Sequence, residues 1–397
     1  MRLGIDASNI RTGGGLTHLA ELLGAAQPHE HGITRIVIWA GQRTLEQLPV
    51  RTWLEPKYEP LLDQPLPLRL YWQKVKLPRL AEQSCDCLFV PGGSYSGSFR
   101  PVVTMSRNLL PYDPAERRRF GVSWMRAKLC LLRVSQTKSL RDADGVIFLS
   151  EYASWAVRQA ANIGGWHPII PHGVNKQFYL APRFQRSIDE YSSDNPFKLL
   201  YVSKVEPYKH QWNVVEAVAL LRRAGVPVSL ELIGGQESPA AWRRLVQVIG
   251  RVDPRSEFIH YLGHVPYHDL AAFYHQADGF VFASSCENLP NILLEAMAAG
   301  LPIACSNFGP MPEVLGDAGI YFNPERPEEI ARMLQTLIEA PDLRRYYGQS
   351  GHERAQLYSW ERCAGETLSY IVEIARKANV SLRIYRQICR KDAMSAR

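Results

Sequence analysis

The sequence contains no long apolar run: nowhere in its 397 residues does an uncharged apolar stretch approach the roughly 18 residues that suggest a transmembrane helix. The N-terminus reaches Asp6 after a short apolar run, so we expect no signal peptide. The seven cysteines are odd in number and scattered, which favours reduced thiols over a disulfide framework. These absences predict a cytoplasmic protein.

Two common cofactor signatures are also missing. The turn Thr12-Gly13-Gly14-Gly15 lacks the spaced glycines of a dinucleotide fingerprint, and no acidic residue ends a clear second strand about 20 residues later, which disfavours a nicotinamide dehydrogenase. Cys85 and Cys87 lie too close together for ordinary zinc spacing, and no paired-aspartate metal motif is present. We therefore expect no bound metal and no cofactor.

Length and composition are those of an ordinary globular protein with two domains. The 46% hydrophobic and 21% charged residues suit full cores. Apolar strand candidates alternate with helical segments in both halves, which predicts α/β units with parallel sheets. Residues 176–196 lose this periodicity and become polar, so we predict a linker between an N-terminal domain (1–175) and a C-terminal domain (197–357), followed by a helix and a basic tail (358–397). Residues 51–79, rich in proline and charge, are expected to be irregular.

The most informative stretch runs from Glu287 to Pro302. Gly279–Ala283 reads as a short apolar strand, and Asn291–Ala299 has helical spacing. In such a strand-loop-helix unit, the free N–H groups at the helix N-terminus lie at the carboxyl end of a parallel strand, where phosphate binds well. Glu287 and Glu295 add carboxylates, each of which accepts hydrogen bonds from two vicinal hydroxyls. The stretch therefore predicts a site for a phosphate and sugar hydroxyls.

This stretch resembles the donor-site signature of the family 4 retaining glycosyltransferases, also described as glycosyl transferases group 1, which have the GT-B fold. The resemblance rests on two glutamates at a set spacing, followed by Glu-Ala-Met-Ala-x-Gly-x-Pro. It implies two Rossmann-like domains facing across a cleft and a C-terminal helix that crosses back to the first domain. By the same resemblance, Glu287 orients the sugar and Glu295 the ribose, and Asn288, Asn291 and Ile292 contact the donor.

Further donor-binding residues follow from the second domain. The strand Phe197–Ser203 leads directly into a loop with Lys204 and Lys209, which we expect to bind a diphosphate. Lys204 departs from the arginine that family members usually carry and keeps the charge without the guanidinium fork. Gly234 ends a further strand, where relatives have a nucleotide-facing turn.

The first domain supplies fewer candidates. The family's glycine-rich loop corresponds to Gly14 and Gly15, near the donor phosphates and the acceptor. Relatives commonly have a histidine at the end of the strand that we predict at Val102–Met105, whereas this sequence has Ser106 or Arg107. An arginine there offers hydrogen bonds to sugar hydroxyls, and the alternative is that Arg107 pairs with Asp113 or solvent. His172, within Pro171-His172-Gly173, is expected at the hinge between domains.

We thus expect an enzyme that moves a hexose, with mannose favoured, from a nucleotide sugar to a saccharide or lipid-linked saccharide. The donor would be GDP-mannose or a UDP-sugar, and the product a cell-surface polysaccharide or glycolipid. Two alternatives stay open: a catalytically degenerate partner subunit, and a nucleotide-sugar epimerase of the same fold. The epimerase is disfavoured because no acid and base pair for it is evident.

The net charge of +7 arises entirely in residues 1–175, which hold 21 basic and 14 acidic side chains. The segment 117–141 alone has eight basic residues, no acidic one, and interleaved apolar residues. It is either an amphipathic helix on the anionic inner face of the plasma membrane, or a solvated helix packed on its own domain. No recognition motif supports nucleic-acid binding.

Overall fold

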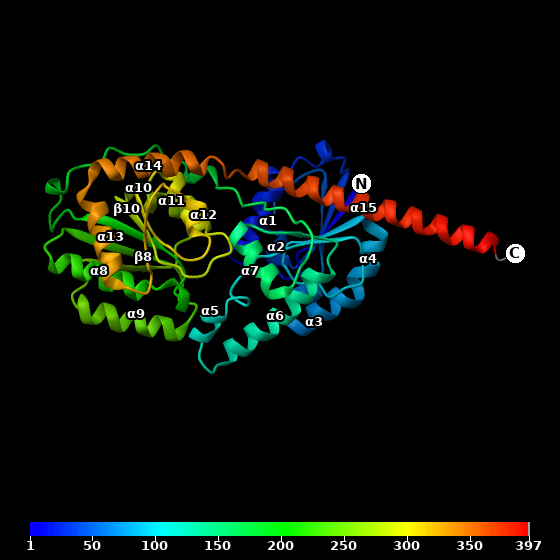
Figure 1. Cartoon of the computed structure of the whole chain (residues 1–397), viewed down its shortest axis with the longest axis horizontal. Helices are drawn as coiled ribbons and strands as arrows, with labels where there is room; N and C mark the ends of the chain where they lie inside the picture. Colours follow the sequence, from blue (N-terminus) through cyan, green and yellow to red (C-terminus); the bar gives the residue numbers. More distant parts are fainter. Residues whose placement is uncertain (396–397) are drawn as a thin grey trace.

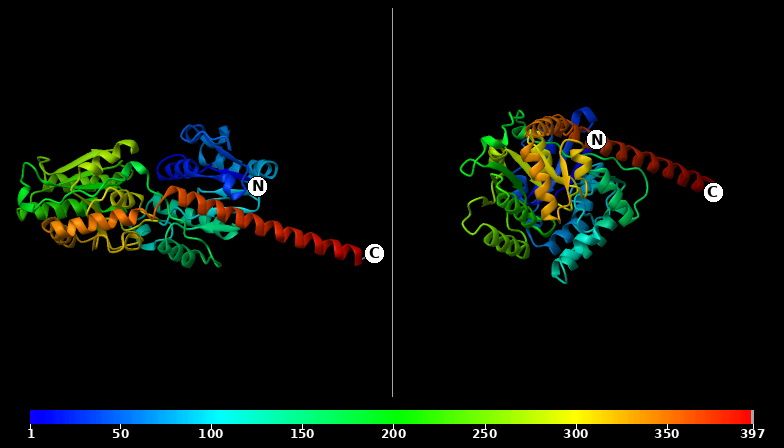
Figure 2. Two further views of the ribbon diagram at one scale, coloured as in Figure 1. Left: turned by 90° about the horizontal axis from the view of Figure 1, so that it is seen from above. Right: turned by 60° about the vertical axis from the view of Figure 1, so that its left-hand side comes forward.

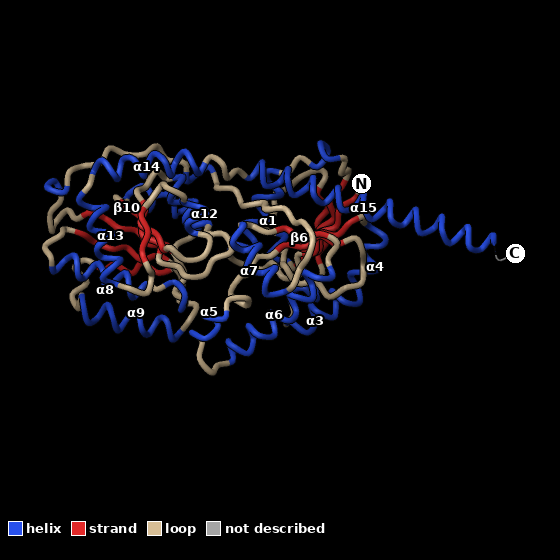
Figure 3. The backbone as a smooth tube through the Cα atoms, in the orientation of Figure 1, coloured by secondary structure: helices blue, strands red, loops and turns tan. Residues whose placement is uncertain are grey.

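The computed structural model describes the backbone of residues 1–395 and the side chains of residues 1–378 and 380. Two lobes lie side by side, each with a sheet at its centre and helices around it (Figure 1; Figure 3). Every strand pair in both sheets is parallel, which confirms the predicted α/β class.

The first sheet has the strand order β3-β2-β1-β4-β5-β6. Its strands are β1 (Arg2–Asp6), β2 (Arg35–Ala40), β3 (Leu54–Tyr58), β4 (Cys87–Val90), β5 (Val102–Met105) and β6 (Gly145–Ile147). The helices of this domain are α1 (Gly14–Ala25), η1 (Pro28–His31), α2 (Gln42–Leu45), η2 (Pro60–Asp63), α3 (Leu66–Tyr71), the π-helical η3 (Trp72–Lys76), α4 (Leu77–Ser84), α5 (Pro114–Arg119), α6 (Trp124–Asp142) and α7 (Glu151–Ala161).

The second sheet has the order β12-β11-β10-β7-β8-β9. Its strands are β7 (Phe197–Val202), β8 (Val228–Ile233), β9 (Ile259–Gly263), β10 (Gly279–Phe282), β11 (Ile303–Ser306) and β12 (Ile320–Phe322). Short turns η4 (Lys176–Phe178) and η5 (Ile188–Glu190) precede it, and the helices are η6 (Pro207–Lys209), α8 (Gln211–Arg223), α9 (Pro239–Val252), η7 (Tyr267–Asp269), α10 (Leu270–Gln276), α11 (Asn291–Ala298), α12 (Met311–Leu315), α13 (Pro327–Glu339), α14 (Pro341–Ala355) and α15 (Trp360–Ser395).

Both sheets therefore have the same doubly wound order, with the chain reversing direction across the sheet between β1 and β4 and between β7 and β10. In such sheets, ligands bind outside the carboxyl ends of the strands at this switch point. The loop after β1 carries the glycine turn, the loop after β7 carries both lysines, and the loop after β10 carries Glu287. The topology places these three segments where a ligand between the domains meets them.

The expectation for residues 51–79 is wrong. This segment forms β3, η2, α3, η3 and the start of α4. β3 is an edge strand in which only Leu54 is buried, so Pro56 is tolerated and no apolar alternation marks the strand. In α3 no residue is buried, so its leucines do not follow an amphipathic pattern.

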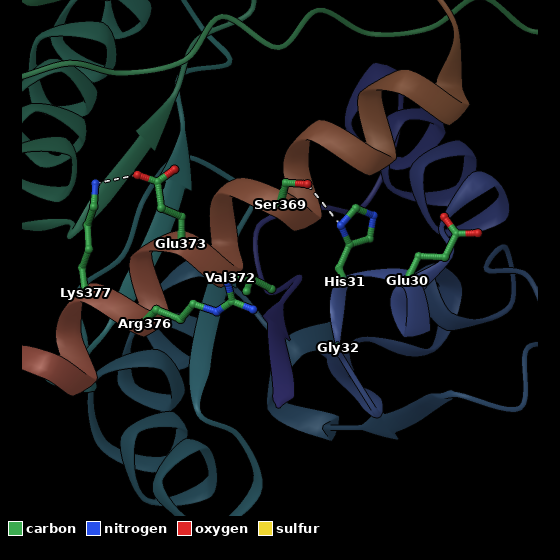
Figure 4. Close-up of a pocket in the computed structure, with 8 residues that line it drawn as sticks. All are labelled: Glu30, His31, Gly32, Ser369, Val372, Glu373, Arg376 and Lys377. Atoms are coloured by element: carbon green, nitrogen blue, oxygen red, sulfur yellow. Dashed lines mark hydrogen bonds and ion pairs between the residues drawn. The ribbon is translucent and has the colours of Figure 1, made fainter.

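Helix α15 crosses back from the second domain and runs along the first, as predicted (Figure 1; Figure 2). Figure 4 shows one place where it lies against η1, with the Ser369 hydroxyl 3.1 Å from Nδ1 of His31. Buried Ile371 and Leu368 hold the helix on the apolar core. The backbone of α15 continues to Ser395, but the side chains of the predicted basic tail lie outside the described residues, apart from Val380.

Within the described part of the chain, no helix has the length and apolarity needed to cross a bilayer. The six cysteines whose side chains are described are unpaired, and five of them are buried. Among these, burial raises the pKa of the Cys286 thiol well above its usual value, so this neighbour of Glu287 is a packed, neutral side chain.

Candidate active site

A cavity of about 880 Å³ opens between the two domains at the paired switch points. The first domain contributes Gly13 and Gly14, and the hinge contributes Gly173 to Asn175. The second domain contributes the predicted donor-site residues Lys204, Lys209, Gly234, Glu287, Asn291, Ile292 and Glu295. Eight of the eleven predicted site residues thus lie on one cavity wall or another.

Lys209 and Glu287 form an ion pair inside this cavity. Only 9% of the lysine side chain and 16% of the glutamate side chain are exposed. The Ser284 hydroxyl donates to the same Glu287 oxygen at 2.6 Å, and the Lys209 ammonium lies 5.2 Å from the Phe282 ring centre. A phosphate that binds the Lys209 ammonium would leave the Glu287 carboxylate without its cation. That carboxylate is then available to accept hydrogen bonds from hydroxyl groups.

Lys204 is more exposed and pairs with Glu237 at 3.3 Å. Its ammonium also reaches the first domain: a β-carbon at Gly13 would stand 3.9 Å from the Lys204 Nζ. Both lysines that we expected to bind phosphate are therefore already neutralised by glutamates. An incoming diphosphate has to displace Glu237 and Glu287, or add to them.

Glu295 also lines the cavity and is buried. The Tyr274 hydroxyl donates to its Oε2 at 2.9 Å. Burial raises the pKa of Glu295 to about 8, although hydrogen bonds from Tyr274 and Tyr267 oppose the shift. At neutral pH, the carboxyl group therefore binds a proton that hydroxyl donors from a ligand would displace.

The N-terminus of α11 faces the cavity through Asn291 and Ile292. Pro290 stands at the N-cap, and no side chain caps the helix. The first-turn amides and the helix dipole favour a negative group at this position. Gly234 closes the neighbouring wall with φ of 148°, and a β-carbon there would lie 2.0 Å from the Ser203 carbonyl oxygen, so only glycine fits.

Arg107 does not line the cavity; it lies behind the glycine loop. Its guanidinium donates to the Gly14 carbonyl at 2.9 Å and to the Gly15 carbonyl at 3.5 Å, and Asp113 caps α5 instead of pairing with it. Burial lowers the pKa of Arg107 to about 10. Gly15 is likewise set back from the cavity. In this structure, Arg107 holds the loop in place and does not pair with Asp113.

A stack of three rings connects the loop to the hinge. The ring centres of His18 of α1 and His172 lie 4.3 Å apart, and those of His172 and Trp360 lie 5.7 Å apart. Because a guanidinium only donates, its contact at 3.2 Å with His18 Nδ1 makes this ring neutral with the proton on Nε2. Burial lowers the pKa of His18 well below its usual value and that of His172 to about 3, with Arg107 adding to both shifts. The neutral His172 contacts the Asn291 side chain at 3.1 Å, so the hinge touches the N-terminus of α11.

Asn288 also lies behind the cavity wall and joins the two domains. Its side-chain amide donates to the Ser106 backbone carbonyl at 2.6 Å, and its backbone carbonyl accepts from the Ser150 hydroxyl at 2.7 Å. Glu313 of α12 reaches across as well and accepts from the first two amides of α7, Glu151 at 2.8 Å and Tyr152 at 2.9 Å. These bonds hold the domains closed around the cavity.

Sequence reasoning missed Glu313, which follows Pro312 in the first turn of α12. The sequence signal at the other end of this contact is Ser150-Glu151, where a serine N-cap starts α7 in the first domain. To connect Glu313 with this N-cap, one has to know that the two domains face each other.

Comparisons with known proteins agree with this geometry. Residues 184–354 match the family model described as "Glycosyl transferases group 1". The chain is 33% identical over 173 residues to the O-antigen chain mannosyltransferase B of Escherichia coli, covering 43% of this chain and 44% of that protein. It is 30% identical over 177 residues to the MMP alpha-(1->4)-mannosyltransferase of Mycolicibacterium hassiacum, covering 43% and 42%. The matches thus span less than half the length of these two relatives.

Solved structures match over nearly the whole chain. HepE from Anabaena, in complex with UDP and glucose, has a TM-score of 0.65 at 19% identity and covers 96% of this chain and 99% of that chain. WaaG, a glycosyltransferase involved in lipopolysaccharide biosynthesis, has a TM-score of 0.67 at 14% identity and covers 94% and 99%. At such identity, the likeness establishes the fold, which is GT-B.

Proposed function

We propose that the chain transfers a hexose from a nucleotide sugar to a saccharide or lipid-linked saccharide, because residues 184–354 match the glycosyl transferases group 1 model and the fold is GT-B. The family resemblance predicted from the sequence is confirmed. Two of its relatives are named mannosyltransferases, which favours mannose as the sugar. We infer retention of the anomeric configuration from the resemblance to the family 4 enzymes.

The observation that carries the proposal is the cavity itself. Its lining combines two lysines, a helix N-terminus without a side-chain cap, and two glutamates, of which one pairs with a lysine and the other accepts from a tyrosine. The first three features suit a diphosphate, and carboxylates suit sugar and ribose hydroxyls. The cavities lined by Gly32, by Thr44, by Asp86 and by Cys130 do not bring these groups together.

In this proposal, the diphosphate lies between Lys204, Lys209 and the first turn of α11. Charge grows on the leaving phosphate as the glycosidic bond breaks, and fixed cations and amides stabilise it at that moment. Glu287, released from Lys209, then accepts hydroxyl groups of the sugar, and Glu295 accepts those of the ribose. The chain's own charges thus serve the leaving group, and the proposal includes no cofactor.

The acceptor, on this proposal, meets the first domain beside the glycine loop. A peripheral position on an anionic membrane fits the surface of α5 and α6, where Trp124 is 78% and Leu131 65% exposed among basic residues. Exposed aromatic and basic side chains on one helix are typical of interfacial binding. A lipid-linked acceptor would be presented at such a surface.

The test is a turnover assay with GDP-mannose and a panel of UDP-sugars, in which release of nucleoside diphosphate is measured without and with membrane lipid extract. Proton NMR of the released or transferred sugar reports its anomeric configuration. Lys209→Met should abolish turnover, whereas Lys57→Met, on the exposed face of β3, should leave it unchanged. If no nucleotide sugar is consumed, the protein is a noncatalytic partner subunit instead; if substrate is converted to an epimer without release of the nucleotide, it is an epimerase.

A further inference from the structure

A second cavity, of about 250 Å³, lies in the first domain at the carboxyl ends of β1 and β2. Thr12 lines both this cavity and the larger one, so only the glycine loop separates them. Its lining includes the guanidinium-bearing residues Arg11 and Arg43. The mechanism proposed above uses neither arginine.

Arg11 and Arg43 line this cavity, and a third arginine, Arg69, bonds to its rim. Arg69 of α3 donates to the carbonyl of the lining residue Ser8 at 3.0 Å, while its own Nε is buried without a hydrogen-bond partner. Burial lowers the pKa of Arg69, and the charge of Arg11 lowers it further, which indicates that these two cations are neighbours. The repulsion between two such guanidinium groups raises the free energy of the folded state, unless an anion binds between them and compensates their charges.

The local carboxylates do not balance these cations. Neither Arg11 nor Arg43 has an acidic partner among the residues whose side chains are described. Asp63 lines the cavity, but one of its oxygens accepts from the Gln42 amide at 3.2 Å. Asp6 lies behind Ser8, bonded to Gln73, and burial raises its pKa. The cavity therefore carries an excess of positive charge.

We propose that Arg11, Arg43 and Arg69 form a subsite for a phosphate group carried by the acceptor. Guanidinium groups bind phosphate oxygens through paired N–H donors, and three of them suit a phosphate monoester or diphosphate better than a neutral sugar. Binding here places the acceptor next to the glycine loop, within reach of the donor cavity. That the ligand is an acceptor rests on the proposed function; that it is a phosphate does not.

The neighbouring helix bears on what else the ligand carries. Arg69 of α3 bonds to Ser8 at the cavity rim, whereas Leu66, Leu68 and Leu70 of the same helix are 51%, 44% and 41% exposed. An exposed apolar helix beside a cationic cavity suits a phosphate attached to a lipid chain. A soluble sugar phosphate shares the same phosphate chemistry, so the experiment separates the two sources.

The first measurement is a calorimetric titration of the full chain with inorganic pyrophosphate. We expect two sites, one at the lysines of the donor cavity and one at the arginines. Arg11→Gln combined with Arg43→Gln should remove the second site or weaken it by about tenfold or more, as expected for lost charge-assisted hydrogen bonds. Arg183→Gln, an exposed arginine of the linker, is the matched control and should leave both sites intact.

Two further probes identify the source of the phosphate. If the phosphate is lipid-borne, phosphatidylcholine vesicles that contain a polyprenyl phosphate should bind the chain more tightly than vesicles with the same charge from phosphatidylglycerol. Both Arg43→Gln and Leu68→Gln should reduce this difference in affinity. If it is soluble, mannose 6-phosphate should bind in an Arg43-dependent manner that Leu68→Gln leaves unchanged.

The subsite is refuted if pyrophosphate and both phosphate probes bind the double arginine variant as they bind the unaltered chain. Arg11 and Arg43 are exposed, so loss of folding does not obscure this result, and an unchanged melting temperature verifies it. Release of nucleoside diphosphate together with arginine-independent phosphate binding would overturn the subsite and leave the proposed function standing. Arginine-dependent phosphate binding without any donor turnover would support the subsite and overturn the proposed function.

Discussion

Replacement of Lys209 by methionine isolates the ion pair at the centre of the candidate site. Methionine keeps much of the lysine's apolar volume against Phe282 and Tyr208, so the main loss is the ammonium group. Glu287 would then lie in a largely buried position with the Ser284 hydroxyl as its remaining side-chain donor. Removing one partner of a buried pair leaves an uncompensated charge.

The expected loss is about 3 kcal/mol, the lower end of the range for broken buried pairs, because Ser284 still donates to Glu287. For domains of this size, that corresponds to a melting temperature lower by roughly 6–12 °C. Glu287→Gln should lower the free energy of unfolding by less, because the unpaired Lys209 ammonium is still stabilised by the Tyr208 and Phe282 rings, whose centres lie within 5.3 Å of it. The double variant removes both charges and should be more stable than Lys209→Met alone.

The assay is a double-variant cycle of thermal melts without ligand. The structure predicts strong coupling, with the effects of Lys209→Met and Glu287→Gln far from additive. Additive effects, or a double variant less stable than Lys209→Met, would show that the two side chains do not stabilise each other. Such a result would also remove the argument that a phosphate frees Glu287 by taking its lysine.

Three other predictions concern neighbouring parts of the molecule. Because the pKa of Glu295 is raised to about 8, the folded state keeps a proton that the unfolded chain releases. This contribution to stability is therefore complete below about pH 4.5 and is lost as the pH rises toward 8. Thermal melts across this pH range should show the loss of stability in the unaltered chain and not in Glu295→Gln. Arg107→Lys should speed hydrogen exchange in the glycine loop, since an ammonium does not reproduce the guanidinium's bonds to two successive carbonyls; protection equal to that of the unaltered chain would contradict the assigned role. Glu313→Ala removes the cap that joins the domains at α7 and should cost about 1 kcal/mol, with a larger radius of gyration by small-angle scattering; an unchanged radius would mean that this contact does not hold the domains together.

The second domain was the more predictable part of the fold. α11 and the strand before it combine a buried apolar run, helical spacing and a glycine-proline stop, all of which are local signals. β3 and α3 in the first domain carry no such signals, because one is an exposed edge strand and the other buries none of its residues. Their structure comes from neighbours that the local sequence does not reveal.

The candidate site divides in the same way. The sequence indicates that Lys209, Glu287 and Glu295 lie near one loop and one helix, and the structure brings them to a common cavity. What Arg107 and Asn288 contact depends on segments more than 90 residues away. Their contacts appear only when the glycine loop and the opposite domain are in position.

The most direct test of the central claim is a thermal-shift panel of nucleoside diphosphates and nucleotide sugars on the unaltered chain and on Glu295→Ala. A ligand that binds only the folded state stabilises it by about 2.7 kcal/mol at a hundredfold excess over its dissociation constant. The account predicts that nucleotides of one base raise the melting temperature and that Glu295→Ala abolishes or strongly reduces the shift. No shift with any nucleotide, or an equal shift in the variant, would contradict a donor site in the cavity between the domains.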